Sequence, residues 1–374
     1  TEVLARQHGA SVGKLCDQIG VSTETRTGAT PAAERRAILA GVAAGEVDLL
    51  IGTHAIIQED VRVPRLAMSI VDEQHRFGVK QRGASGNATE TAHASHLLVM
   101  SATPIPRSLS LTLFGDLDLS LIDQLPAGRQ PIRTAIVREK DEDDVWQACR
   151  QEVAAGHQVY VIYPVIEETE GQDLKAATVE WERLQSEVFP GLKVALLHGR
   201  LKAKDKAAVM DRFSEGEVQV LVATTVVEVG VDVPNATAMV IHNPERFGLA
   251  QLHQLRGRIG RGTEQSYCWL LVDRFLGEES FQRIRFFAGH NDGFALAEED
   301  LRLRGPGDAW GVRQSGAPGF RLANPLTDRE LVQVCRDDAR DYLADDPQLK
   351  SKVGQMVAKA LRESFGRHVP LQAG

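Results

Sequence analysis

The sequence predicts an α/β fold with two sets of parallel strands, followed by a mostly helical carboxy-terminal region. Three observations support this prediction. Short apolar runs alternate with longer stretches of helical character, a pattern typical of parallel sheets covered by helices on both faces. A turn-rich segment at residues 125–131 separates the runs into two sets. After about Phe275 the runs stop and charged helical stretches follow.

Seven apolar runs are predicted to be buried strands. They span residues 48–52, 68–72, 97–101, 159–163, 194–198, 218–222 and 238–241. Parallel sheets of this kind place their chemistry at the carboxyl ends of the strands. The polar residues that close these runs are therefore the first candidates for a functional site.

The segment at residues 125–131 is rich in Pro and Gly, which end regular elements, so we place a domain boundary there. We expect three regions: residues 1–125, 126–275 and 276–374. The chain begins at Thr1 rather than Met, and we expect that further residues precede it.

Composition excludes several classes of protein. The chain has 374 residues, 43% of them apolar, but no apolar run approaches the roughly 20 residues that a membrane span needs. Its four cysteines are widely scattered without metal-ligand spacing, which argues against zinc and favours a cytoplasmic location. A net charge of −8 argues mildly against a nucleic-acid binder, although a local Lys/Arg groove can bind phosphates on an acidic protein.

Two adjacent carboxylates, Asp72 and Glu73, stand at the end of the second run. In nucleotide hydrolases the first carboxylate of such a pair holds Mg²⁺, usually through water, and the second orients the attacking water. Two acidic residues can also simply begin a loop, so the pair alone leaves both interpretations open.

Hydroxyl groups follow two other runs. Ser101 and Thr103 can hydrogen-bond the carboxylate pair, whereas Thr224 and Thr225 can bind a nucleic-acid phosphate. Farther along, Asp232 can bind a ribose hydroxyl or an arginine. Ordinary Ser/Thr turns are the alternative at each of these positions.

The most specific pattern is a run of arginines among glycines at residues 251–262, with Arg256, Arg258 and Arg261. Glycine lets the backbone approach a ligand closely. Planar guanidinium groups bind phosphate oxygens and stabilise charge that develops on a transferring phosphoryl group. A merely solvated basic surface would not need the glycines, so this pattern favours phosphate chemistry.

Taken in order, these features resemble the conserved motifs of superfamily 2 helicases. Eight elements follow one another in helicase order, from motif Ia to motif VI. They lie at residues 1–5 (Ia), 52–54 (Ib), 72–75 (II), 101–103 (III), 161–164 (IV), 198–200 (IVa), 223–235 (V) and 251–261 (VI).

This resemblance implies two RecA-like parallel-sheet motor domains, the first incomplete, and a carboxy-terminal translocation region. It implies ATP and Mg²⁺ as cofactors, with Mg²⁺ at Asp72. The implied catalytic residues are Asp72, Glu73, Arg258 and Arg261, and nucleotide binding adds His75, Asp232 and Gln254. The implied DNA-binding or coupling residues are Thr1, Thr53, His54, Ser101, Thr103, His198, Arg200, Thr224, Thr225, Arg302, Arg304 and Gln314.

Within that superfamily, the sequence of this chain is similar to that of the RecG family at residues 72–79, 101–108, 254–258 and 292–316. The last segment looks like a translocation motif that RecG shares with the transcription-repair coupling factor. That factor usually has Glu where this chain has Gln74 and Thr where it has Ser101, so both residues favour RecG.

The family's phosphate-binding loop, Gly-x-x-x-x-Gly-Lys-[Ser/Thr], does not occur in this sequence. Its backbone amides cradle phosphates and its lysine neutralises them. RecG carries this loop shortly before motif Ia, where this chain begins, so we expect a truncated chain that lacks ATP turnover by itself.

The resemblance therefore implies an ATP-dependent DNA helicase that remodels branched double-stranded DNA, such as stalled forks and four-way junctions, in recombination and repair. A single-strand-binding protein is a further expected partner, and no membrane is expected. Two alternatives remain at this point. One is a transcription-repair coupling translocase, and the other is a non-catalytic DNA- or partner-binding module with a helicase-like fold.

Overall fold

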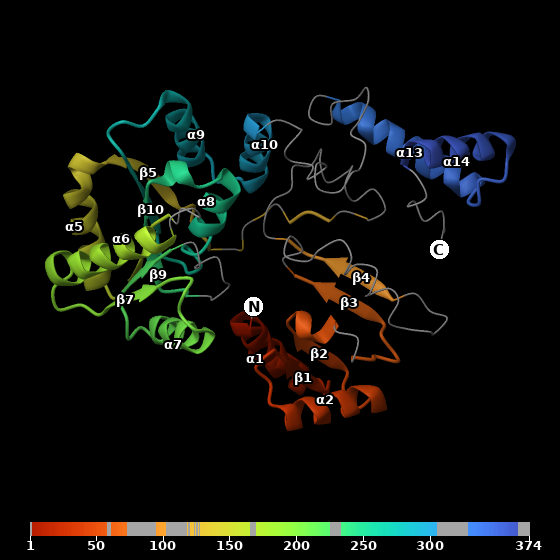
Figure 1. Ribbon diagram of the computed structural model, residues 1–374, viewed down its shortest axis with the longest axis horizontal. Helices are drawn as coiled ribbons and strands as arrows, with labels where there is room; N and C mark the ends of the chain where they lie inside the picture. Colours follow the sequence, from red (N-terminus) through yellow and green to blue (C-terminus); the bar gives the residue numbers. More distant parts are fainter. Residues whose placement is uncertain are drawn as a thin grey trace. The chain divides into compact units, whose positions relative to one another are not determined.

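A computed structural model describes residues 2–57, 61–72, 95–101, 118, 120–122, 124, 126, 128–164, 170–224, 233–304 and 328–365 (Figure 1). The chain divides into two compact units, each described by itself. One comprises Thr1–Thr103 and Ala127–Gly289, and the other comprises Pro104–Pro126 and His290–Gly374.

The amino-terminal part of the first unit contains two pairs of short parallel strands among its described residues. Its elements are α1 (Glu2–Gln18), β1 (Thr23–Arg26), α2 (Ala32–Ala44), β2 (Leu49–Gly52), the 3-10 turn η1 (His54–Ile57), β3 (Met68–Val71) and β4 (His96–Val99). Strand β1 pairs with β2 and β3 pairs with β4, while α1 packs on the β1–β2 pair.

The rest of the first unit is built on a six-stranded, entirely parallel sheet in the order β5-β10-β9-β6-β8-β7. Its strands are β5 (Arg133–Arg138), β6 (Gln158–Ile162), β7 (Val194–Leu197), β8 (Val220–Ala223), β9 (Ala236–His242) and β10 (Tyr267–Val272). Its helices are η3 (Glu139–Asp141), α5 (Glu142–Ala154), α6 (Glu170–Arg183), η5 (Leu184–Val188), α7 (Ala203–Ser214), η7 (Pro244–Arg246), α8 (Leu249–Arg256) and α9 (Glu278–Gly289).

The inner strands β6, β8 and β9 are buried on both faces, which explains why they read as continuous apolar runs. Successive side chains of β6 point to opposite faces of the sheet. Val159 and Val161 belong to the cluster that contains Trp146 of α5. Tyr160 packs on Phe213 of α7, with ring centroids 4.9 Å apart. The side chains packed on the two faces of the sheet thus hold the carboxyl ends of the strands in place.

The second unit is helical in its described residues, with α10 (Gly293–Arg304), α13 (Arg329–Asp345) and α14 (Lys352–Phe365). No helix in the described part of the chain is long and apolar enough to cross a membrane. The predicted fold class is confirmed: two RecA-like parallel-sheet domains are followed by a mostly helical region.

All seven predicted runs form strands, namely β2, β3, β4, β6, β7, β8 and β9, with ends that differ by at most two residues. The sequence analysis did not single out β1, β5 or β10.

Candidate functional site

Asp72 and Ser101 directly follow the paired strands β3 and β4. Val71 pairs with Val99, and the Met100 amide donates a hydrogen bond of 2.8 Å to the Val71 carbonyl. The structure therefore places these two candidates at the same edge of one strand pair. The Asp72 carboxylate lies 3.9 Å from His8 Nε2 of α1, and its side chain is 40% exposed. Glu73, His75 and Thr103 lie outside the described residues.

Thr53 lies between β2 and η1, and His54 is the first residue of η1. The Thr53 hydroxyl accepts a hydrogen bond of 3.4 Å from the Ala55 amide. Gly52 is required immediately before them, because a Cβ there would overlap the Arg26 carbonyl oxygen. The close approach of two backbones thus fixes where Thr53 and His54 emerge. The remaining candidate of the amino-terminal part, Thr1, lies outside the described residues.

A second group of candidates meets at the carboxyl edge of the six-stranded sheet, where β6, β8 and β7 are neighbours. The Thr224 amide donates to the Leu197 carbonyl at 3.1 Å, so Thr224 lies beside His198. The Tyr163 amide donates to the Ala223 carbonyl at 2.9 Å, so Tyr163 flanks Thr224 on the other side. The Thr224 side chain is 3% exposed, and its hydroxyl has no hydrogen-bond partner among the described residues.

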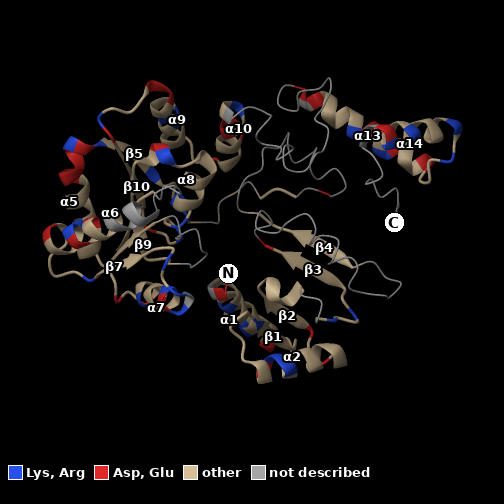
Figure 2. Cartoon of the chain, viewed as in Figure 1, with Lys and Arg blue, Asp and Glu red and all other residues tan. Residues whose placement is uncertain are grey.

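The turn at residues 198–200 is braced by α7. Lys206 Nζ donates a hydrogen bond of 2.6 Å to the Gly199 carbonyl. Partial burial, followed by the charges of Lys206 and Arg200, lowers the pKa of His198. His198 is therefore neutral at neutral pH, and the positive charge of this turn comes from Arg200 and Lys206. Figure 2 shows the basic residues of α7 at this side of the sheet.

The arginine turn, residues 257–262, follows α8. The Arg258 amide donates to the Leu255 carbonyl at 2.9 Å, and Arg261 Nε donates to the Gly257 carbonyl at 3.2 Å. Gln254 and Arg258 are half-buried and Arg261 is exposed. The last two can therefore present guanidinium groups near the surface of the sheet domain.

Arg256, one residue earlier, has a different position. It is 2% exposed and its guanidinium lies over the Phe287 ring, 4.2 Å from the centroid. It also donates to the Phe287 carbonyl at 3.2 Å and to Thr134 Oγ1 at 3.4 Å. Arg256 thus holds α8, β5 and α9 together.

An aromatic and ionic cluster lies beneath the strand ends. The His242 ring stacks on Tyr163 with centroids 4.2 Å apart and on Trp146 at 5.9 Å. Arg183 bridges Glu142 at 3.0 Å and Glu180 at 2.9 Å, and Tyr163 Oη donates to Glu180 at 3.3 Å. This cluster was not predicted from the sequence, although Tyr163 is the last residue of a predicted strand and His242 is the last residue of β9.

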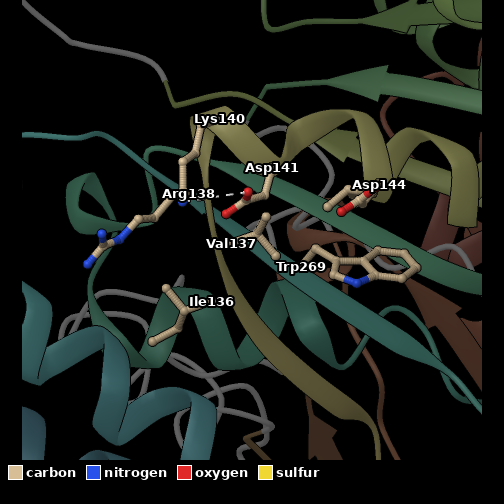
Figure 3. A pocket seen from close by; sticks show the side chains of 8 residues that line it. Ile136, Val137, Arg138, Lys140, Asp141, Asp144 and Trp269 are labelled. Carbon is tan, nitrogen blue, oxygen red and sulfur yellow. Dashed lines mark ion pairs between the residues drawn. The ribbon is translucent and has the colours of Figure 1, made fainter.

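A cavity of about 510 Å³ lies at the carboxyl end of β5, the edge strand opposite β7 in the strand order (Figure 3). Arg138, Lys140, Asp141 and Asp144 give it both signs of charge, with Trp269 on one side. None of the candidate residues lines this cavity, so it is separate from the candidate site.

In the helical unit, Arg302 forms an ion pair with Glu299, with nitrogen–oxygen distances of 2.7 and 2.8 Å. This hydrogen bond lowers the pKa of Glu299. The Arg304 side chain and Gln314 lie outside the described residues, as do Thr225 and Asp232 of the sheet domain.

Three family models match successive parts of this chain. Residues 1–111 match the DEAD/DEAH box helicase family, residues 144–263 the helicase conserved C-terminal domain, and residues 290–370 the C-terminal part of domain 3 of ATP-dependent DNA helicase RecG. The described edge residues Asp72, His198, Thr224 and Arg258 therefore lie within helicase family matches.

The chain is similar to curated proteins named ATP-dependent DNA helicase RecG. It is 49% identical over 354 residues to the protein of Synechocystis sp., covering 94% of this chain and 42% of that protein. It is 46% identical over 353 residues to the protein of Thermotoga maritima, covering 94% and 45%. The chain thus spans less than half the length of these two relatives.

Solved structures show the same fold. A structure of RecG bound to a three-way DNA junction matches with a TM-score of 0.70 and 44% identity, covering 89% of this chain and 42% of that one. S. cerevisiae Dbp5 bound to RNA and ADP BeF3 matches with a TM-score of 0.54 and 17% identity, covering 78% and 73%. The second match shows the fold alone.

Proposed function

Since the chain is homologous to RecG helicases over nearly its whole length, we propose that it is the motor portion of an ATP-dependent DNA helicase. This helicase moves on double-stranded DNA and remodels branched DNA, including stalled forks and four-way junctions, in recombination and repair. The observation that carries the proposal is that two helicase family matches are followed by a RecG-specific match in one chain. The last match favours RecG over a transcription-repair coupling translocase.

In this proposal Asp72 holds Mg²⁺ and Glu73 orients the attacking water. Mg²⁺ usually binds through one or two carboxylates together with substrate phosphates and water, rather than in a cage of protein ligands. An exposed carboxylate at a strand end fits this preference, and no group of three or more candidate metal ligands clusters in the described ranges. When ATP is bound, it supplies the free energy for movement.

Arg258 and Arg261 stabilise the charge that develops on the transferring phosphoryl group. His75, Asp232 and Gln254 complete the nucleotide contacts. The half-buried position of Arg258 supports this role, because a guanidinium shielded from water binds an anion more strongly.

The edge formed by β6, β8 and β7 grips the DNA backbone in this proposal. Thr224, neutral His198 and cationic Arg200 would contact phosphates rather than base edges. Such contacts position a protein without reading sequence, which suits a motor that must release DNA at each step. The other proposed contacts are Thr1, Thr53, His54, Ser101, Thr103 and Thr225.

The proposed division of labour follows the boundaries 1–125, 126–275 and 276–374. Arg302, Arg304 and Gln314 of the last region couple nucleotide state to DNA movement. A single-strand-binding protein as partner and a cytoplasmic location, which free cysteines favour, are also part of the proposal.

The test uses a chimera in which this chain replaces the segment that it matches in the Synechocystis relative. We expect ATP hydrolysis that branched DNA stimulates, and conversion of a model fork into a four-way junction. Asp72→Asn should abolish hydrolysis while junction binding persists. The chain alone should hydrolyse ATP negligibly, because its sequence has no phosphate-binding loop. Equal activity of the chimera on linear and branched duplexes would contradict the proposal.

A further inference from the structure

Residues 129–132, which lead into β5, lie alongside the arginine turn. The two segments exchange side-chain hydrogen bonds to backbone carbonyls. These bonds are Arg129 Nε to Gly260 O (2.7 Å), Gln130 Nε2 to Thr263 O (3.1 Å) and Gln265 Nε2 to Pro131 O (2.9 Å). The Arg133 amide then donates to the Ser266 carbonyl at 2.9 Å, where the β5–β10 pairing begins. The connecting segment thus extends the sheet contact toward the arginines.

Gly260 is shaped for this contact. It has φ of 69°, in the left-handed region that favours glycine. A Cβ at this position would lie 2.9 Å from Ile132 Cγ1, closer than a real side chain tolerates. Both constraints bring the Gly260 carbonyl within reach of Arg129.

The partner of Arg129 lies between Arg258 and Arg261 in the sequence. A hydrogen bond from a charged group contributes more than a neutral one, and the half-buried position of Arg129 protects it from water. Gln130 donates to the Thr263 carbonyl and Gln265 donates to the Pro131 carbonyl. Neither of these bonds involves a candidate residue. Among these contacts, the Arg129 bond is therefore the one that acts on the backbone between the two arginines.

We propose that Arg129 is a positioning residue for the arginine turn. By holding the Gly260 carbonyl it sets the directions of Arg258 and Arg261, and it ties them to the segment that joins the two motor domains. This inference rests on the proposed role of these two arginines in ATP hydrolysis. A change at the nucleotide then reaches the connecting segment through the hydrogen bond from Arg129 to the Gly260 carbonyl.

The first experiment is hydrogen exchange on the chain as it stands. In Arg129→Ala, the amides of residues 257–262 should exchange about tenfold faster, because a local contact that limits opening is lost. Exchange in β6 and β9 should not change, which separates a local role from general destabilisation. Arg133→Ala is the matched control, since it removes the same charge from an exposed side chain nearby. Unchanged exchange of residues 257–262 in Arg129→Ala would overturn the proposal.

If Arg129→Ala instead loses protection throughout the sheet, Arg129→Lys decides the matter, because it keeps a cationic donor. Restored protection in β6 and β9 with intermediate exchange at residues 257–262 supports positioning. Wild-type exchange at both places refutes a specific arginine contact.

The second experiment measures ATP hydrolysis in the chimera. Arg129→Ala should lower kcat about tenfold while KM for ATP and DNA affinity change less than twofold, because ground-state binding is untouched. Arg129→Lys should recover part of kcat. A raised KM with unchanged kcat would overturn the proposal. If the unsubstituted chimera shows no DNA-stimulated hydrolysis, the proposed function fails, and the exchange experiment alone decides whether Arg129 holds the turn.

Discussion

Arg256, Arg258 and Arg261 follow one another closely in the sequence, but their surroundings differ. Arg256 is almost fully buried against Phe287 of α9, whereas Arg258 is half-buried and Arg261 is exposed. Their spacing among glycines could not reveal this difference, because Phe287 lies 31 positions later in the chain. The motif resemblance singled out Arg258 and Arg261 as candidates, and the structure adds that Arg256 is buried against Phe287.

The first prediction concerns the two surface arginines. In the chimera, Arg258→Ala or Arg261→Ala should lower DNA-stimulated ATP hydrolysis by about 10³-fold, as loss of an arginine finger does. DNA affinity, measured by fluorescence anisotropy on a forked duplex, should remain nearly unchanged. Arg246→Ala, in η7, serves as a control for loss of charge in the same domain. Loss of DNA affinity with intact single-turnover hydrolysis would show that the arginine belongs to the DNA contact.

The second prediction concerns His242. Burial between Tyr163 and Trp146, with a smaller effect from the Arg183 charge, lowers the pKa of His242 to about 3. In the unfolded chain its pKa is about 6.5, so the unfolded state binds the extra proton as pH falls between these values. The free energy of unfolding therefore falls on acidification, because the unfolded state takes up a proton that the folded state does not. At pH 5 the loss should be about 1 to 2 kcal/mol.

Urea unfolding of the chain at pH 7.5 and pH 5 tests this. His242→Phe keeps a ring for stacking but cannot titrate, so its free energy of unfolding should fall less than that of the wild type. Equal losses in the two proteins would assign the acid sensitivity to other groups.

At the scale of elements, apolar runs identified seven strands, and three others were not predicted. Strand β1 reads Thr-Glu-Thr-Arg and is polar, and its burial comes from pairing with β2 and packing under α1. Strand β5 is an edge strand, so half of its side chains stay exposed and its pattern is weak. The Tyr-Cys-Trp-Leu-Leu-Val run of β10 does carry an apolar signal, which the sequence analysis overlooked.

The order of strands also limited what could be predicted about the site. His198 and Thr224 were both assigned to DNA contacts from their motifs. Their proximity follows from β7 lying beside β8, and sequence order alone does not establish which strands are neighbours. The motifs therefore identified His198 and Thr224 as candidates, and the sheet topology shows that they lie close together.

The third prediction concerns the helical region that follows α9. In the chimera, Arg304→Ala or Gln314→Ala should leave DNA-stimulated ATP hydrolysis intact and abolish fork conversion, because the motor then turns over without moving DNA. Both activities should be measured on the same preparation. Arg362→Ala, on the exposed surface of α14, is a control for charge loss in this region. A proportional fall in both activities, or no fall in either, would make the region a structural cap.

At the scale of the whole molecule, the two sheet regions differ in how well they are covered. Val159, Val161 and Val240 of the six-stranded sheet are fully buried. By contrast, Ile70 of β3 is 57% exposed and Leu98 of β4 is 42% exposed. Apolar residues of a parallel sheet are normally covered on both faces. An incomplete first domain would leave apolar residues of its strands exposed, as Ile70 and Leu98 are. That the first domain is incomplete stays a prediction.

The fourth prediction measures this difference. In the isolated chain, hydrogen exchange should be slowest in β6 and β9, and at least about 100-fold faster in β3 and β4, because local opening is cheaper where few apolar contacts are broken. The chimera, which adds the rest of the Synechocystis relative, should slow exchange in β3 and β4 without changing β6. Equal protection of the two regions in the isolated chain would contradict an incomplete first domain.

The parallel order β6-β8-β7 also sets the length of DNA backbone that this edge can contact. Neighbouring strands lie about 4.8 Å apart, so the outer two of three adjacent strand ends are roughly 10 Å apart. A B-form strand advances 3.4 Å per nucleotide, so this edge spans about three phosphates. Each neutralised phosphate changes the slope of log affinity against log salt by about −0.9. Cationic side chains release these counterions, and Arg200 is the candidate cation at this edge, so Arg200→Ala should reduce the slope in the chimera by about 1.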